Sequence, residues 1–286
     1  MGISGPGGAL MLKTWFITGA SRGLGAAVAR EALRRGDNVV ATARDPASVT
    51  ACLPAYEGLL AVPLDVTDEP QAHAAAEAAI QRFGRIDVLL NNAGFGLLGA
   101  VEEATAAEIE RVYRTNVFGL LAVTRAVLPH MRRQRRGHVL NVSSIGGYAA
   151  SAGWGVYCST KFAVEGLMEA LALELKPLGI RATVIEPGFF RTDFLDARSL
   201  SVSSVEIPDY AETAGAIRHF AAGANHTQPG DPDKLAKGVL RIVDVEEPPM
   251  RMPFGSDALQ RIEAKNAIVA RELAEWRQLV VSTDAT

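Results

Sequence analysis

Tyr157 and Lys161 are the residues whose types and spacing first suggest chemistry. They lie four positions apart in a segment with helical spacing, so their side chains share one face of the helix. A tyrosine phenol has a pKa near ~10 and is a poor base at neutral pH. A neighbouring ammonium favours the phenolate and lowers that pKa. The pair is therefore a candidate for acid–base chemistry, although the same spacing also arises by chance in long helices.

Ser144 is a third candidate, because it precedes Tyr157 by thirteen residues and ends a predicted strand. Ligands of open α/β sheets bind in the crevice at the carboxyl ends of the strands. We therefore expect the Ser144 hydroxyl to point into that crevice.

A glycine-rich turn, TGASRGLG over residues 18–25, joins the first predicted strand to the first predicted helix. Such a turn lets backbone amides approach a pyrophosphate at the positive end of the helix. A plain tight turn is the alternative, but the position at the first strand–helix junction favours a dinucleotide site. The expected cofactor-binding residues of this turn are Gly19, Ser21, Arg22, Gly23, Leu24 and Gly25.

The end of the second predicted strand indicates which nicotinamide cofactor binds. An acidic residue about 20 positions after the turn is expected where a ribose 2′-hydroxyl is bound, but here Ala43 precedes Arg44. Arg44 and Arg22 can both form fork-like hydrogen bonds to a 2′-phosphate. The sequence therefore favours NADP(H) over NAD(H). In the alternative interpretation, Arg44 is solvated and Asp45 binds the ribose.

Short apolar runs alternate with helical segments along the chain and must position these residues. Strands are predicted over residues 13–18, 38–42, 59–63, 86–90, 139–142 and 180–185, with a last one over 251–254. Helices are predicted over residues 24–35, 70–83, 106–133, 156–176 and 257–276. This alternation is typical of βαβ units, whose crossovers are right-handed. It predicts a doubly wound α/β Rossmann domain, with a parallel sheet of about seven strands and helices on both faces.

The alternation of strands and helices changes after Pro187. Residues 188–230 are mixed and contain several glycines and prolines, which predicts a small helical lid. His219 and His226 fall in this segment and are expected at its surface rather than in catalysis. No linker composition follows, so we expect a single domain over residues 11–286 after a flexible, glycine-rich tail over residues 1–10.

Composition excludes several classes of protein. The chain has 286 residues, of which 48% are hydrophobic and 21% charged, and its formal net charge is −3. This balance is typical of a globular protein and not of a disordered one. Cys52 and Cys158 cannot form a disulfide framework, and no Cys/His spacing indicates a metal site.

Charge and hydropathy also argue against nucleic acid and membrane partners. The one dense basic run, residues 132–136, ends a predicted helix, where cations complement the helix dipole. The longest uncharged run, residues 137–160, contains Asn141 and five glycines and is too polar to span a bilayer. No secretory signal is visible, so a cytoplasmic protein is expected.

Several motifs occur in the order and spacing of one enzyme family, which the sequence resembles over residues 13–192. That family is the short-chain dehydrogenase/reductase family. The resemblance implies a catalytic tetrad of Asn116, Ser144, Tyr157 and Lys161. The motifs are TGASRGLG, NNAG at 91–94, Asn116, NVSS at 141–144, YCSTK at 157–161 and PG at 187–188.

The resemblance assigns each member of the tetrad a role. Tyr157 would protonate the carbonyl oxygen of a substrate while hydride arrives from the nicotinamide. Ser144 would hold that oxygen. Lys161 would bind the nicotinamide ribose and lower the pKa of the phenol, and Asn116 would anchor a chain of waters that returns protons from solvent.

The resemblance implies further cofactor contacts. Asp65 and Val66 are expected at the adenine, and the NNAG motif along the cofactor, although that motif also supports packing between strand and helix. The residues expected along the cofactor and beside the nicotinamide are Asn92, Ala93, Gly94, Pro187, Gly188 and Thr192.

The C-terminal part resembles a narrower subgroup. The runs PGDPDKLA at 229–236 and PFGSDAL at 253–259 are similar to those of bacterial relatives of 17β-hydroxysteroid dehydrogenase. This likeness implies no steroid substrate, because specificity depends on variable loops.

Apolar and aromatic residues are concentrated in the segments 95–98, 145–154 and 189–210. They favour a hydrophobic ketone or alcohol as substrate, with packing of the lid against the body as the alternative. The candidate pocket residues are Phe95, Gly96, Leu97, Ile145, Trp154, Phe189 and Phe190.

These features predict an NADP(H)-dependent carbonyl reductase or alcohol dehydrogenase that acts on an apolar small molecule. One alternative is a 3-oxoacyl-(acyl-carrier-protein) ketoreductase, although the C-terminus is long for that group. Another is a non-catalytic NADP(H)-binding sensor, which we would expect to lack Tyr157 or Lys161. The family resemblance also implies a homodimer or homotetramer, assembled through the helices that contain Asn116 and Tyr157.

Overall fold

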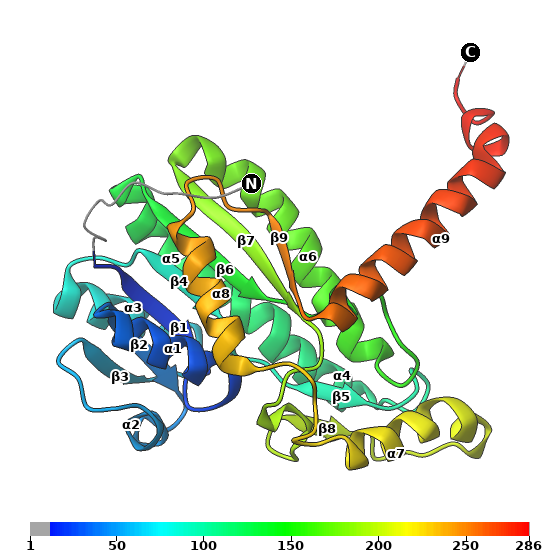
Figure 1. The fold of residues 1–286 in the computed structure, drawn as a ribbon, viewed down its shortest axis with the longest axis horizontal. Coiled ribbons are helices and arrows are strands. Elements are labelled where there is room, and N and C mark those ends of the chain that lie inside the picture. Colours follow the sequence, from blue (N-terminus) through cyan, green and yellow to red (C-terminus); the bar gives the residue numbers. More distant parts are fainter. Residues whose placement is uncertain (1–11, 286) are drawn as a thin grey trace.

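The computed structural model describes residues 12–285, and the tail predicted over residues 1–10 lies outside the described residues. One sheet has seven parallel strands in the order β3-β2-β1-β4-β6-β7-β9 (Figure 1). This order confirms the predicted doubly wound parallel sheet. The strands are β1 (Thr14–Thr18), β2 (Asn38–Ala43), β3 (Leu59–Pro63), β4 (Val88–Asn91), β6 (Gly137–Val142), β7 (Ile180–Pro187) and β9 (Arg251–Phe254).

Helices cover both faces of the sheet, because its central strands are apolar on both sides. Trp15 and Ile17 of β1 belong to one core cluster, to which three of the helices contribute. Phe16, between them, belongs to the cluster on the opposite face. The first cluster lies under α1 (Gly23–Arg35) and α8 (Pro232–Asp244), and the second under α3 (Glu69–Phe83) and α5 (Leu120–Gln134). Beside α5, α6 (Gly155–Leu175) packs Met168 against Val184 of β7.

The helix predicted over residues 106–133 is interrupted. α4 (Ala106–Tyr113) and α5 are joined by a π-helical turn over Arg114–Gly119. Such turns are frequent at functional sites, and this one carries Asn116. The chain therefore continues in one direction, but the turn changes which side chains face the sheet.

Three short elements escaped prediction. α2 (Ala47–Cys52) follows β2, and β5 (Gly96–Leu98) and β8 (Leu200–Val202) pair in parallel as a separate two-stranded sheet. The segment predicted as a helical lid is therefore only partly helical, with α7 (Ala216–Gly223) as its one regular α-helix. Three-residue strands carry no detectable periodicity, and β8 forms because β5 lies beside it.

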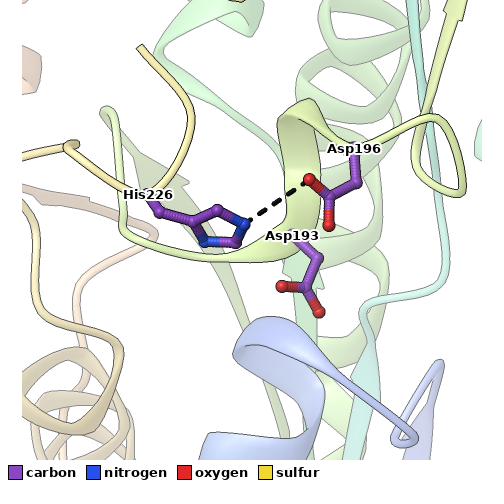
Figure 2. A group of neighbouring side chains, drawn as sticks. All are labelled: Asp193, Asp196 and His226. Atoms are coloured by element: carbon purple, nitrogen blue, oxygen red, sulfur yellow. Dashed lines mark ion pairs between the residues drawn. The ribbon is translucent and has the colours of Figure 1, made fainter.

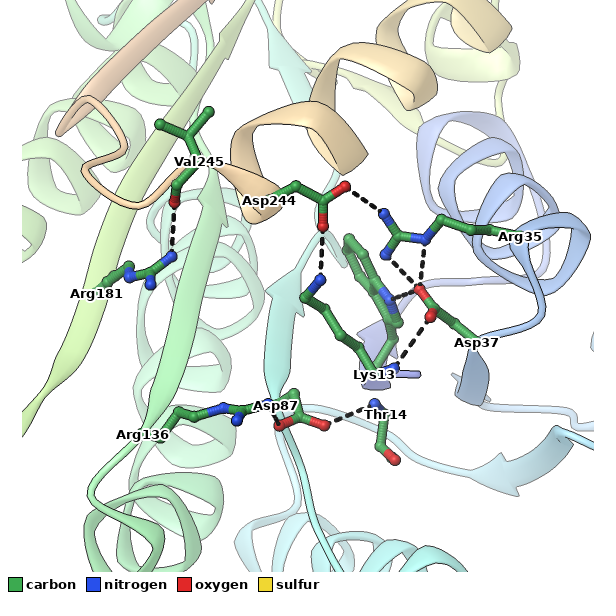
Figure 3. Close-up of polar contacts among 10 residues, drawn as sticks. Lys13, Thr14, Arg35, Asp37, Asp87, Arg136, Arg181, Asp244 and Val245 are labelled. Carbon is green, nitrogen blue, oxygen red and sulfur yellow. Dashed lines mark hydrogen bonds and ion pairs between the residues drawn. The ribbon is translucent and has the colours of Figure 1, made fainter. Parts of the chain in front are cut away.

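Polar side chains join the amino ends of the strands to neighbouring helices (Figure 3). Asp37 accepts hydrogen bonds from the Lys13 amide at 3.0 Å and from the Trp15 indole at 2.8 Å, and it also pairs with Arg35. Asp244, at the end of α8, lies 2.6 Å from Lys13 Nζ and pairs with Arg35 as well. Two carboxylates thus connect β1, α1 and α8 at the edge of the sheet.

The basic run at residues 132–136 lies at the end of α5, as predicted. Arg135 adopts a φ of 52° as the left-handed cap of the helix and donates a hydrogen bond to the Pro177 carbonyl oxygen at 2.8 Å. Arg136 lies 3.4 Å from the buried Asp87 (Figure 3). These two arginines are therefore engaged with the body of the protein.

The last helix, α9 (Ser256–Val281), is longer than the predicted 257–276 and extends away from the sheet (Figure 1). Ala258 is its only buried residue. Within residues 12–285, no helix combines the length and the apolar character needed to cross a membrane.

Candidate active site

A cavity of about 640 Å³ lies at the carboxyl ends of the parallel strands, between the strand-end loops and the segment that follows Pro187. Its volume is in the range of small-molecule and cofactor sites. The predicted site residues that line it are Gly19, Ser21, Arg22, Gly23, Leu24, Arg44, Asp65, Val66, Asn92, Ala93, Gly94, Phe95, Ser144, Ile145, Trp154, Tyr157, Lys161, Pro187, Gly188, Phe189, Phe190 and Thr192. The predicted residues outside its lining are Gly25, Gly96, Leu97 and Asn116.

The glycine-rich turn forms one end of the cavity. Gly19 has a φ of +63°, and a Cβ there would lie 3.0 Å from the Ala93 Cα, so glycine is required. Gly25 lies under the turn, where a Cβ would meet the Gly19 carbonyl oxygen. No side chain caps the first amides of α1, since its N-cap residue Arg22 makes no such hydrogen bond. These amides fit the pyrophosphate of a dinucleotide.

The loop after β2 carries the residues that bear on cofactor choice. Arg44 lines the cavity and is exposed, and it has no ion pair within residues 12–285. The Asp45 carboxylate accepts a hydrogen bond from the Ala47 amide at 3.0 Å at the start of α2 and does not line the cavity. Arg44 is therefore the charged residue that this loop presents to a bound nucleotide.

Arg22 has a different environment from the one predicted. Its guanidinium donates hydrogen bonds to the Arg198 carbonyl oxygen at 2.8 Å and to the Ser199 Oγ at 3.1 Å. It thereby joins the glycine-rich turn to the lid segment just before β8. The structure brings it to the cavity but gives its guanidinium partners within the protein.

The NNAG motif has the packing role that its sequence also suggested. The Thr18 Oγ1 accepts hydrogen bonds from the backbone amides of Asn92 at 2.9 Å and Ala93 at 3.0 Å. In return, the Asn92 side chain donates to the carbonyl oxygens of Thr18 and Gly19, each at 3.0 Å. The motif therefore holds the end of β4 against the glycine-rich turn, and it also lines the cavity.

Tyr157 is buried at the amino-terminal end of α6, in an aromatic cluster. Its ring centroid lies 5.7 Å from that of Trp154 and 5.7 Å from that of Phe194. Burial raises the pKa of the Tyr157 phenol, opposite to the lowering predicted from Lys161, and it is the side chain of Ser144 that opposes this rise. The phenol is therefore protonated at neutral pH and able to donate a proton.

Lys161 lies one helical turn after Tyr157, with its Nζ 5.8 Å from the centroid of the tyrosine ring. The Nζ donates a hydrogen bond to the Val142 carbonyl oxygen at 2.9 Å, at the end of β6. Burial lowers the pKa of the Lys161 ammonium to about 8, and the nearby Glu165 opposes this shift. The predicted pair thus shares one helix face and one cavity wall.

Asn116 lies behind the cavity wall rather than in it. Its amide nitrogen donates to the Phe95 carbonyl oxygen at 3.0 Å and to the Thr160 Oγ1 at 3.2 Å, and its oxygen accepts from the Phe95 amide at 3.1 Å. These bonds use both ends of the side chain to hold the Phe95 loop against α6. Asn116 makes these bonds from within the π-helical turn Arg114–Gly119.

Five of the seven predicted pocket residues line the cavity. Leu97 instead packs with Val112 and Val156 in a separate core cluster. A Cβ on Gly96 would lie 3.0 Å from Leu200 Cδ1, so that this position faces the lid strand β8. Packing against α4 and α6 thus removes Leu97 from the pocket, and the close approach of Leu200 of β8 covers Gly96.

Gln228 is a cavity residue that the sequence did not indicate. It lies in the lid, it is buried, and its side-chain nitrogen and oxygen have no hydrogen-bond partner within residues 12–285. Burying an unpaired amide is costly, so this group is suited to a polar atom of a bound molecule. A single glutamine carries no sequence signal, and only its position in the fold reveals it.

A pair of buried glutamates lies next to this site. Glu165 follows Lys161 by one turn of α6, and Glu186 is the penultimate residue of β7. Arg251 of β9 is their shared cation, with its Nε 3.1 Å from Glu165 and 3.7 Å from Glu186. Burial and the neighbouring Glu165 raise the pKa of the Glu186 carboxyl to about 7.

Asp193, Asp196 and His226 form the one group of metal-ligand side chains in the described part of the chain (Figure 2). His226 Nε2 lies 3.6 Å from Asp196 Oδ1, and this contact, an ion pair when the imidazole is protonated, connects two segments of the lid. His226 is exposed, as predicted from the sequence. Asp193 lines the cavity, whereas the other two residues lie outside it.

The model of the short chain dehydrogenase family matches residues 13–201. The chain belongs to the short-chain dehydrogenase/reductase family. Oxidoreductase BOA17 of Botryotinia fuckeliana is 38% identical, over 96% of this chain and all of the relative. A 3-ketodihydrosphingosine reductase of Bacteroides thetaiotaomicron is 39% identical, over 84% of this chain and 87% of the relative. A short-chain dehydrogenase structure from Streptomyces avermitilis has a TM-score of 0.89 and 40% identity, over 97% of this chain and all of that one.

Solved relatives with nicotinamide cofactors share this fold. The structure of ElxO with NADP bound has a TM-score of 0.70 and 26% identity, over 87% of this chain and all of that one. A 3-ketoacyl-(acyl-carrier-protein) reductase of Brucella melitensis, complexed with NADH, has a TM-score of 0.72 and 25% identity, over 86% of this chain and 98% of that one. The family and these neighbours support a nicotinamide cofactor and an oxidoreductase activity for this chain.

Proposed function

We propose that this protein is an NADP(H)-dependent oxidoreductase that interconverts an apolar ketone and the matching secondary alcohol. The observation that carries the proposal is the meeting of Ser144, Tyr157 and Lys161 in one cavity beside the glycine-rich turn. General acid catalysis requires a proton donor that shares a site with the reacting group.

The residues divide the chemistry as follows. Bound NADPH would supply the hydride to the carbonyl carbon. Tyr157 donates its phenolic proton to the carbonyl oxygen, and Ser144 holds that oxygen by a hydrogen bond. The Lys161 ammonium stabilises the phenolate that remains on Tyr157. Asn116 does not line the cavity, and its role is to hold the Phe95 loop against α6.

Arg44 supports NADPH as the preferred cofactor. It is exposed at the cavity and has no ion pair within residues 12–285, while the carboxylate of the adjacent Asp45 accepts a hydrogen bond from the Ala47 amide. A guanidinium forms bidentate hydrogen bonds with a phosphate, whereas a nearby carboxylate would repel the phosphate.

The lining of the cavity supports an apolar substrate. Trp154 and Phe194 contribute aromatic surface beside Tyr157, and Phe189 and Phe190 also line the cavity. The similar 3-ketodihydrosphingosine reductase is named for a ketone substrate. We also propose that the C-terminal part is related to the bacterial relatives of 17β-hydroxysteroid dehydrogenase.

Two further parts of the proposal concern the whole protein. We propose that it is cytoplasmic and that it assembles through the helices that contain Asn116 and Tyr157.

The test is to titrate the purified protein with NADPH and NADH and then to measure turnover on a panel of apolar ketones. We expect NADPH to bind at least about tenfold more tightly, which corresponds to about 1.4 kcal/mol. The Tyr157→Phe variant should lose at least about 100-fold in turnover and keep its NADPH affinity. Tyr56→Phe, a change at an exposed tyrosine remote from the cavity, is the matched control.

Each alternative gives a different result in this experiment. Tighter binding of NADH would contradict the role of Arg44. Turnover only on acyl-carrier-protein thioesters would indicate the ketoreductase. Tight NADPH binding without turnover on any ketone or alcohol would indicate the sensor.

A further inference from the structure

The helix α9 is anchored to the body only at its start. Arg261 donates hydrogen bonds to the Ala149 carbonyl oxygen at 2.6 Å and to the Ser151 hydroxyl at 2.7 Å. One turn later, Tyr148 donates a hydrogen bond to the Asn266 side chain. Beyond Asn266 every residue of the helix is exposed, and the helix leads away from the sheet (Figure 1).

Six of the apolar residues of α9 follow a heptad pattern, whereas Ile268, Leu279 and Val281 lie outside it. Seven positions are spaced alternately by three and four residues, and six of the seven are apolar. This 3.5-residue repeat is typical of helices that pair with another helix through one seam. The seam consists of Leu259, Ile262, Asn266, Val269, Leu273, Trp276 and Val280.

The distal part of the seam is exposed and has no partner in the described chain. Leu273 and Trp276 are 59% and 55% exposed, and Val280 is 54% exposed. A helix in water gains most of its stability from packing of its apolar face rather than from intrinsic propensity. A seam of this length therefore requires a second surface.

We propose that a second copy of this chain covers the seam and that the two α9 helices pair in antiparallel orientation. The start of each helix already lies against its own body, and Asn266 is bonded to Tyr148. A parallel pair would force the two anchored ends and the two bodies together. An antiparallel pair places the free end of each helix along the anchored start of the other.

The residues of the seam are complementary in this orientation. With Asn266 opposite Val269 of the second copy, Ile262 meets Leu273 and Leu259 meets Trp276. Lys265 and Glu272 occupy the same flanking position of consecutive heptads, one residue before Asn266 and Leu273. In the antiparallel pair each Lys265 therefore lies on the side of the second copy's Glu272, which adds two attractive contacts.

The charges of α9 favour a second copy over a membrane surface. The helix carries four acidic and four basic residues, so it has no net charge. Helices that lie on anionic membranes are instead rich in lysine and arginine on the polar face. The acidic residues are Asp257, Glu263, Glu272 and Glu275, and the basic ones are Arg261, Lys265, Arg271 and Arg277.

Two neighbouring substitutions test the seam by sedimentation of the full-length protein. Val269→Asp places a carboxylate in its central layer, whereas Ile268→Asp places the same charge on the adjacent, outward face. Val269 and Ile268 are 38% and 42% exposed, so the pair is closely matched. We expect Val269→Asp to raise the dissociation constant for pairing through α9 about 100-fold, so that this variant sediments as a smaller oligomer than the wild type. Ile268→Asp should sediment as the wild type does.

Several results would overturn the proposal: a monomeric wild-type protein, an unchanged assembly in Val269→Asp, or equal loss in both variants. A monomer that floats with phosphatidylcholine vesicles would assign the seam to lipid instead. NADPH affinity and circular dichroism report whether each variant is folded, because neither Ile268 nor Val269 lines the cavity.

Cysteine cross-linking tests the orientation without a disruptive charge. A mixture of the Ile262→Cys and Leu273→Cys variants should form a disulfide-linked dimer on mild oxidation, because these positions face each other in the antiparallel pair. Neither variant should do so alone. A linked dimer of Leu273→Cys alone would indicate parallel helices and contradict the proposal.

Discussion

Among single residues, Glu186 has the most unusual environment. Its carboxyl group is fully buried beside Glu165, with Arg251 as the shared cation. Arg251 also pairs with the exposed Glu169, so three carboxylates compete for one guanidinium. Two buried carboxylates with a single cation favour the retention of a proton between them. That proton should make the stability of the protein depend on pH.

We expect the free energy of unfolding to fall as pH rises from about 5 to about 7, by on the order of 2 kcal/mol. In the folded protein the pKa of Glu186 is raised from 4.5 to about 7. Between these values the folded state keeps a proton that the unfolded chain has lost, so rising pH favours unfolding. Urea denaturation of the wild type and of Glu186→Gln measures the effect, which the variant should largely lose.

Glu212→Gln is the control for this measurement, because Glu212 is exposed and should leave the pH profile unchanged. A profile that is identical in the wild type and Glu186→Gln would show that the buried pair does not titrate in this range.

Among the elements, the lid and the start of α1 are joined through one side chain. Arg22 bonds to Arg198 and Ser199 of the lid, while Arg44 at the end of β2 has no such partner. The sequence predicted that Arg22 and Arg44 bind the same 2′-phosphate, but in the structure only Arg22 is bonded to the lid. Their substitutions should have different effects on the two cofactors.

Arg22→Ala should weaken NADPH and NADH binding by similar factors, because a loosened lid covers both cofactors less well. Arg44→Ala should weaken NADPH binding alone, by about tenfold, or about 1.4 kcal/mol. Titration of both variants with both cofactors separates the two roles. If Arg22→Ala weakens only NADPH binding, then Arg22 contacts the 2′-phosphate as its sequence position suggested.

In the molecule as a whole, a polar network lies at the amino edge of the sheet and the candidate active site lies at the carboxyl edge. Asp37 connects Lys13, Trp15 and Arg35 in a buried network at the amino edge (Figure 3). The cavity lies at the opposite ends of the same strands. Damage to the network should therefore lower stability without changing the reaction.

Asp37→Ala should lower the free energy of unfolding by about 3 kcal/mol, because it leaves a guanidinium, an indole N–H and a backbone amide without their acceptor. Denaturant titration measures this loss, and the turnover of the folded fraction should stay within about twofold of the wild type. Asp284→Ala, at an exposed position, should leave stability unchanged. A stable Asp37→Ala variant would mean that water replaces the carboxylate.

Most of the fold follows from local patterns. The alternation of apolar runs with helical segments predicts the parallel sheet, because buried strands and amphipathic helices have different periodicities. Short elements such as β5 and β8 follow no such rule, since three residues show no period. The π-helical turn at Asn116 was also not predicted, because its residues are compatible with an ordinary α-helix.

The sequence by itself determined the fold class, the glycine-rich turn and the pairing of Tyr157 with Lys161, because each depends on residues that are close along the chain. Only the tertiary structure decided which of the predicted residues reach the cavity. It moved Leu97 into a core cluster, joined Arg22 to the lid and brought Gln228 to the site. These outcomes depend on contacts between different elements of the chain, which no local pattern specifies.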